Sequence, residues 1–86
     1  MNKDEFFDAF IAVRDHVRNL ASSPEKDLLL AVHELWGRKV LTVETVKDIR
    51  HLWYVRNTIT ASPGGYVEIS DVSIQTLKRV KVALGI

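Results

Sequence analysis

The chain has 86 residues, of which 47% are hydrophobic and 27% are charged, a composition that suits one folded domain and is unlike that of a disordered chain. It contains no cysteine, so disulfides, thiolate metal ligands and a cysteine nucleophile are excluded. No apolar run approaches the roughly 20 residues that a membrane helix needs, and the acidic N-terminus is unlike a signal peptide. We therefore expect a cytoplasmic protein without a membrane partner.

The net charge of +1 conceals an asymmetry between the two parts of the chain. Residues 1–34 carry four basic and seven acidic side chains, whereas residues 35–86 carry eight basic and four acidic ones. Opposite charges of this kind steer one half of a bundle onto the other, or one subunit onto another. The basic residues form no dense run, so the charge pattern does not by itself indicate a nucleic-acid footprint.

The first predicted helix spans residues 3–21. Its apolar positions Phe6, Phe10, Val13, Val17 and Leu20 recur at steps of three and four, which is the spacing of an amphipathic helix, and Phe7 and Ile11 widen this stripe.

A second helix is predicted over residues 24–37. Either Ser22 or Ser23 is expected as its N-cap, and Pro24 suits the first helical turn. Gly37 is expected as the C-cap.

The third and fourth helices are predicted over residues 43–61 and 71–84. Thr42 is expected to cap the third, and Ser70 or Asp71 the fourth. One proline and two glycines between residues 62 and 65 separate them.

Four helices with short connections predict an all-α, antiparallel up-and-down four-helix bundle, with the Pro/Gly loop before the last helix. Residues 66–69 alternate briefly and are expected to be an extended connector. A winged helix is the alternative fold, with residues 66–69 as its wing. The unbroken helix predicted over 43–61 argues against it, because a helix-turn-helix requires a turn in that stretch.

The spacing of the third helix places an arginine on its apolar face. Arg56 follows Leu52 by four residues and Ile49 by seven, so we expect it to point inward. A buried guanidinium is costly unless it is paired, and its donors suit a carboxylate or a phosphate. Arg56 is therefore expected to reach solvent from the helix end, to pair with Glu34 or Asp27, or to face an RNA phosphate or a dimer interface.

The residues around this arginine also resemble a known family. A long helix ends with Arg56 and Asn57, a proline- and glycine-bearing loop follows, and residues 69–71 (Ile-Ser-Asp) open the last helix. This order is similar to the C-terminal half of HEPN domains, which are small and often dimeric helical bundles in ribonuclease toxins and in RNA-processing or defence proteins. The family's catalytic signature is an arginine, usually followed by a polar residue, with a histidine after four to six intervening positions.

The histidine of that signature is missing, because residues 61–63 are Ala-Ser-Pro. Metal-independent RNA cleavage needs a group of near-neutral pKa to move a proton, and arginine stays protonated. The resemblance therefore implies a degenerate HEPN-like domain that is more suited to interaction than to catalysis. We expect it to need no cofactor and to bind a second copy, a partner protein or RNA. The expected interface residues are Leu52, Trp53, Tyr54, Arg56 and Asn57.

Two alternative functions remain. The first is a ribonuclease of HEPN type, in which His51 or Tyr54 acts with Arg56 and Asn57. His51 lies five residues before Arg56 on another side of the helix, so it would reach this site only from a second subunit.

The second alternative is a winged-helix nucleic-acid binder. Its candidate contact residues are Arg38, Lys39, Lys47 and Arg50.

No metal site is expected. His16, His33 and His51 lie on three different predicted helices, and no two of them have the i, i+4 spacing of a helical metal site.

Overall fold

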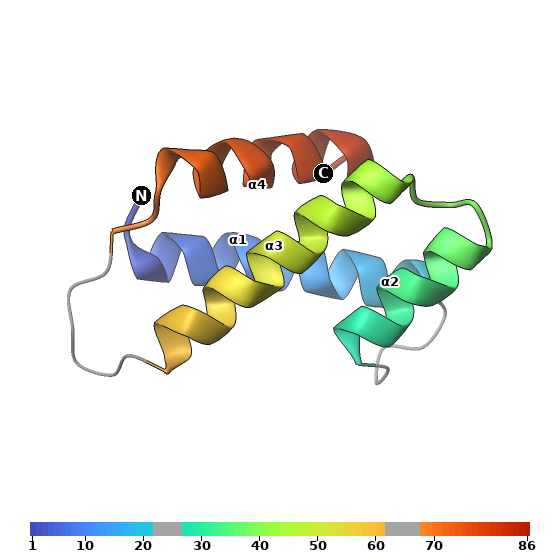
Figure 1. Ribbon diagram of the computed structural model, residues 1–86, viewed down its shortest axis with the longest axis horizontal. Coiled ribbons are helices and arrows are strands. Elements are labelled where there is room, and N and C mark those ends of the chain that lie inside the picture. The colour runs from blue at the N-terminus through green and yellow to red at the C-terminus, as the bar shows by residue number, and fades with distance from the viewer. Residues whose placement is uncertain (22–26, 62–67) are drawn as a thin grey trace.

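A computed structural model describes residues 1–21, 27–61 and 68–86. Within these ranges the chain forms four helices and no strand, which confirms the predicted all-α four-helix bundle. The helices are α1 (Lys3–Leu20), α2 (Leu28–Gly37), α3 (Val43–Thr60) and α4 (Asp71–Leu84). In Figure 1, α3 crosses obliquely in front of α1 and runs in the opposite direction to both α1 and α4. None of these helices has the length and the apolar content needed to cross a bilayer.

Polar side chains define where the helices begin. Thr42 and Ser70 cap α3 and α4 as predicted, each accepting a hydrogen bond from the backbone N–H three residues further on. The start of α2 differs from the prediction of residue 24. Its N-cap is Asp27, whose carboxylate accepts a hydrogen bond from the backbone N–H of Leu29 at 3.0 Å. The caps predicted for α2, Ser22 and Ser23, lie outside the described residues, as does the Pro/Gly loop at 62–65.

The core lies where the four helices meet. Its fully buried side chains come from every helix, because each one presents an apolar stripe to the others. The largest of them are Phe6, Val13, Val17, Val32, Leu35, Ile49, Leu52 and Val80. The predicted stripe of α1 is confirmed at Phe6, Phe10, Val13 and Val17, whereas Ile11 and Leu20 are exposed and lie outside the core.

Polar contacts join α3 to α4 beside this core. The guanidinium of Arg79 donates two hydrogen bonds to the carboxylate of Asp48, at 3.1 and 3.2 Å, and a third to Thr76 Oγ1 at 3.1 Å. The hydrogen bonds and charge of Asp48 raise the pKa of Arg79 above its ordinary value. One helical turn further on, His51 Nε2 lies 3.1 Å from the hydroxyl oxygen of Ser73. These pairs set the register between the two helices.

The C-terminus of α2 differs from the prediction that Gly37 is its C-cap. Gly37 is the last helical residue, and Lys39 takes the left-handed conformation with φ of 62°. The backbone N–H of Lys39 donates to the carbonyl of Trp36, and that of Val40 donates to the carbonyl of Leu35. These two bonds form a Schellman motif, in which glycine is the favoured residue at the left-handed position. The glycine of this segment therefore lies two residues before the position that needs it.

Two substitutions at this helix end are expected to stabilise the domain. Lys39→Gly removes the steric cost of a side chain in the left-handed region, about 1–2 kcal/mol. Gly37→Ala adds a Cβ that meets no atom within 4 Å and gains about 0.4–1 kcal/mol. Urea denaturation should show both gains. Gly85→Ala, at a φ of 74°, is the control and should lose stability; a loss for Lys39→Gly would contradict the strain argument.

Candidate functional site

The predicted interface residues on α3 have very different surroundings. Leu52 is fully buried and belongs to the core, so it presents no surface to a partner. Trp53 is half-buried and packs against the core, whereas Tyr54 is 69% exposed. Asn57 is half-buried.

Arg56 is exposed, contrary to the prediction that it points inward. The inward residues of α3 are Thr45, Ile49, Leu52 and Ile59. Around Arg56 the neighbouring helices present a polar pocket in place of a packed core, because two arginines of α1 and the N-cap of α2 lie there. The guanidinium therefore stays in contact with water and avoids the cost of burial.

The expected carboxylate partners do not form an ion pair with Arg56 in the described part of the chain. Glu34 forms an ion pair with Arg38 at 3.5 Å, and Asp27 caps α2. Arg56 Nη1 instead donates a hydrogen bond to Asn57 Oδ1 at 3.0 Å. The arginine and asparagine of the HEPN-like signature thus contact each other.

His51 and Arg56 lie in different parts of the surface. His51 faces α4 through Ser73 and lines hollows that also contain Tyr54. Arg56 lines the pocket against α1. None of these three pockets is lined by both His51 and Arg56, so none of them brings together the proton carrier and the cation that a nuclease needs.

The pocket beside Arg56 contains two residues that the sequence analysis did not select. Arg14 and Arg18 are four residues apart on α1 and face α3 across a cavity of about 160 Å³. The cavity is lined by Phe10, Arg14, Arg18, Asp27, Leu28, Trp53 and Arg56, which we call the arginine pocket. The i, i+4 spacing shows that Arg14 and Arg18 share a side of α1. That this side meets Arg56 depends on tertiary structure.

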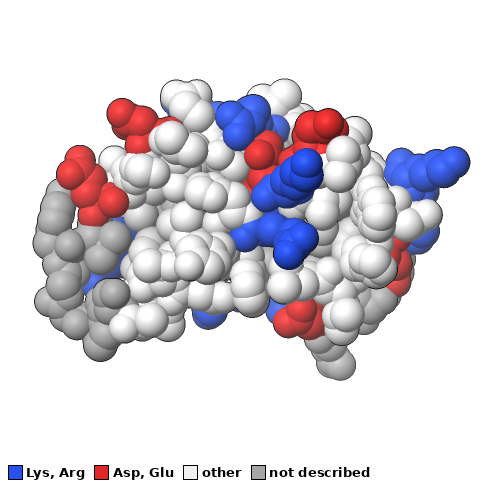
Figure 2. Space-filling model, viewed as in Figure 1, with Lys and Arg blue, Asp and Glu red and all other residues white. Residues whose placement is uncertain are grey.

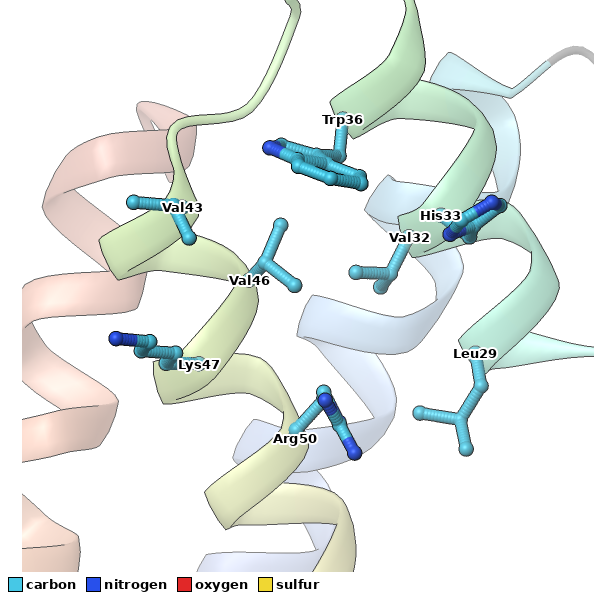
Figure 3. Close-up of a pocket in the computed structure, with 8 residues that line it drawn as sticks. All are labelled: Leu29, Val32, His33, Trp36, Val43, Val46, Lys47 and Arg50. Atoms are coloured by element: carbon cyan, nitrogen blue, oxygen red, sulfur yellow. The ribbon is translucent and has the colours of Figure 1, made fainter.

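A larger and mostly apolar groove lies between α2 and α3 (Figure 3). Trp36 and Val32 of α2 and Val46 of α3 point into it, and the guanidinium of Arg50 lies near Leu29. We call this hollow the α2–α3 groove, and its volume is about 400 Å³. It is lined by Leu29, Val32, His33, Trp36, Val43, Val46, Lys47 and Arg50. A second hollow shares Leu29, Lys47 and Arg50 and continues to Trp53 and Tyr54. The groove therefore reaches part of the predicted interface.

Charged side chains lie near the middle of this face, along its top and at its edges (Figure 2). Figure 2 shows blue atoms near the middle of the face with uncharged surface on both sides. Two exposed cations of α3, Lys47 and Arg50, belong to the groove. Arg38 and Lys39, the other candidates for a winged-helix contact, lie at the C-terminal end of α2, and α3 has no turn within it. In the described ranges, no three metal-ligating side chains come together.

Comparisons with known proteins found no match: no family model, no curated protein and no solved structure is significantly similar to the chain. The chain is a small all-α bundle with a mostly apolar groove between α2 and α3. The similarity to HEPN domains stays a prediction.

Proposed function

We propose that this chain is a small non-catalytic helical domain that forms a homodimer through the α2–α3 groove. The observation that carries the proposal is the apolar surface of that groove. Trp36 is 48% exposed and Val43 is 44% exposed, although both are large apolar side chains. A contiguous apolar hollow with a polar edge is typical of a protein-binding site.

The occupant we propose is the outer face of α1 from a second copy. Asp4, Asp8, Ile11 and Asp15 follow one another at steps of four, three and four residues and are all exposed. This helix face therefore combines an apolar residue with carboxylates on either side. It complements a groove that is apolar inside and carries Lys47 and Arg50.

The surface available is sufficient for such a contact. A standard interface buries about 800 Å² on each partner. The described structure exposes 5523 Å², so this interface would take roughly one seventh of it. We expect a dimer of moderate affinity that assembles at micromolar concentrations.

The direct test is the molar mass in solution. Sedimentation equilibrium at tens of micromolar should show a dimer for the wild type. Trp36→Glu should weaken the dimer at least a hundredfold, because a carboxylate would be buried in the apolar groove without a partner. Val82→Glu is the matched control, since Val82 is 82% exposed on α4, away from the groove, and should leave the dimer intact. A wild type that is strictly monomeric overturns the proposal.

Charge reversal tests the choice of α1 as the occupant. One variant carries Lys47→Glu with Arg50→Glu, and the other carries Asp8→Lys with Asp15→Lys. Each variant alone should be monomeric, because its groove and its α1 then have charges of the same sign. Mixed together, the two should form a heterodimer, since both reciprocal contacts again join opposite charges. Failure of the folded variants to associate on mixing would exclude α1 as the occupant.

The separation of His51 from Arg56 supports a non-catalytic role. We expect structured RNA to remain uncleaved on incubation with the wild type or with Arg56→Ala. Gel analysis of the RNA is the measurement. Cleavage by the wild type that Arg56→Ala abolishes would restore the nuclease alternative.

A further inference from the structure

The arginine pocket has too much positive charge to be explained as packing. Arg14, Arg18 and Arg56 come from two helices and line one cavity of about 160 Å³, and among the described residues of its lining the only carboxylate is that of Asp27. Three guanidinium groups repel one another when nothing negative lies between them. Their convergence requires a compensating anion or exposure to water.

Arg18 is the most informative of the three. Its side chain is half-buried, and its Nε atom is buried and has no hydrogen-bond partner among the residues that the structure describes. Native proteins rarely leave such a donor unpaired, so this N–H is available to an acceptor that enters the pocket. Arg18 forms no ion pair with a carboxylate in the part of the chain that the structure describes.

The other two arginines are held in place by their sequence neighbours. Arg14 donates from Nε and Nη2 to the carboxylate of Asp15, at 3.2 and 3.1 Å. Arg56 Nη1 donates to the side-chain oxygen of Asn57. Each guanidinium keeps further N–H donors for a ligand. Both forks are oriented before binding, which lowers the entropy cost of holding an anion.

We propose that the arginine pocket binds a phosphate group. Among the described residues the lining holds three guanidinium groups and the carboxylate of Asp27, and Arg14 is also paired with Asp15, so three cations against two carboxylates leave a charge of +1 for an anion to balance. Phosphate carries about −1.5 to −2 at pH 7. Arginine forks pair with phosphate oxygens in a bidentate manner, and a phosphate monoester offers three acceptor oxygens to the three guanidinium groups, against two in a carboxylate ligand. The cavity is smaller than the about 300–1,000 Å³ that encloses a whole drug-sized ligand. It therefore takes one phosphate group, either free or at the end of a larger molecule.

Tryptophan fluorescence gives a local readout, because Trp53 lines the pocket. The chain has two tryptophans, so Trp36→Phe leaves Trp53 as the only reporter. In this background, inorganic phosphate is titrated at constant ionic strength maintained with sodium chloride. We expect a saturable change in emission, with a midpoint that rises at least tenfold in Arg18→Met and in Arg56→Met. Arg38→Met removes the same charge elsewhere and should leave the midpoint unchanged.

Thermal unfolding separates a ligand site from a structural role of Arg18. Without phosphate, the Tm of Arg18→Met should equal or exceed that of the wild type, because the variant loses charge repulsion and an unpaired donor. Phosphate should raise the Tm of the wild type and leave that of Arg18→Met unchanged. A lower Tm for Arg18→Met with an unaltered phosphate midpoint would overturn the proposal, as would the absence of a saturable response in the wild type.

A phosphate monoester distinguishes the two sources of the group. Glycerol 3-phosphate is titrated in the same way as inorganic phosphate. A midpoint at least tenfold lower supports the terminal phosphate of a larger ligand, whereas an equal or higher midpoint supports free phosphate. Both results require that Arg18→Met raises the midpoint at least tenfold.

Discussion

Leu52→Ala is expected to lower the free energy of unfolding by about 2–5 kcal/mol. Leu52 is completely buried at the centre of α3, so its truncation leaves a cavity among the surrounding helices. A domain of 86 residues has a total stability of only about 4–13 kcal/mol. The variant should therefore unfold at a much lower urea concentration, with the transition followed by far-UV circular dichroism.

Tyr54→Ala is the matched control for this substitution. Tyr54 lies two residues further along the same helix but is 69% exposed, so its truncation should change stability by less than about 0.5 kcal/mol. The comparison separates a core residue from a surface residue within the predicted interface. Equal losses for the two variants would contradict the orientation of α3.

Phe6→Ala should have an effect of similar size, a loss of about 3–5 kcal/mol. The ring of Phe6 is fully buried and is stacked with that of Phe10, with their centroids 6.2 Å apart. Removing it takes away apolar burial and an aromatic pair at once. The measurement is again urea denaturation, with the midpoint compared at an unchanged slope.

Phe7→Ala provides the comparison at the next position. Phe7 is half-buried and packs against the edge of the core, with its ring edge-on to that of Phe6 at 6.4 Å. Its loss should cost clearly less than that of Phe6. If Phe7→Ala were the more damaging change, the inward face of α1 would be assigned incorrectly.

The buried side of α1 and the starting points of α3 and α4 can be predicted from local signals in the sequence. The apolar spacing of Phe6, Phe10 and Val13 predicts which side of α1 is buried, because the period of 3.6 residues is a property of the helix itself. Thr42 and Ser70 cap their helices through hydrogen bonds that span only three residues. Such features need no knowledge of the rest of the fold.

The ends of α2 show where local signals mislead. Gly37 has the residue type of a C-cap, but Lys39 occupies the left-handed position. Val40 and Leu41 both donate backbone hydrogen bonds to the carbonyl of Leu35, and Leu41 is buried. The position where α2 ends is therefore set by the packing of the segment that follows it. This packing holds Lys39 in a left-handed conformation that glycine would adopt more easily.

Local signals in the sequence predicted the four helices, the buried side of α1 and the N-caps of α3 and α4, because these depend on interactions within a few residues. The tertiary structure decided the surroundings of Arg56. Its spacing from Ile49 indicates an inward face, but a helix face is buried only where another helix covers it with apolar side chains. At this position α1 presents Arg14 and Arg18, so the face borders a charged pocket and Arg56 stays exposed. The α2–α3 groove also depends on tertiary structure, because residues of both helices line it.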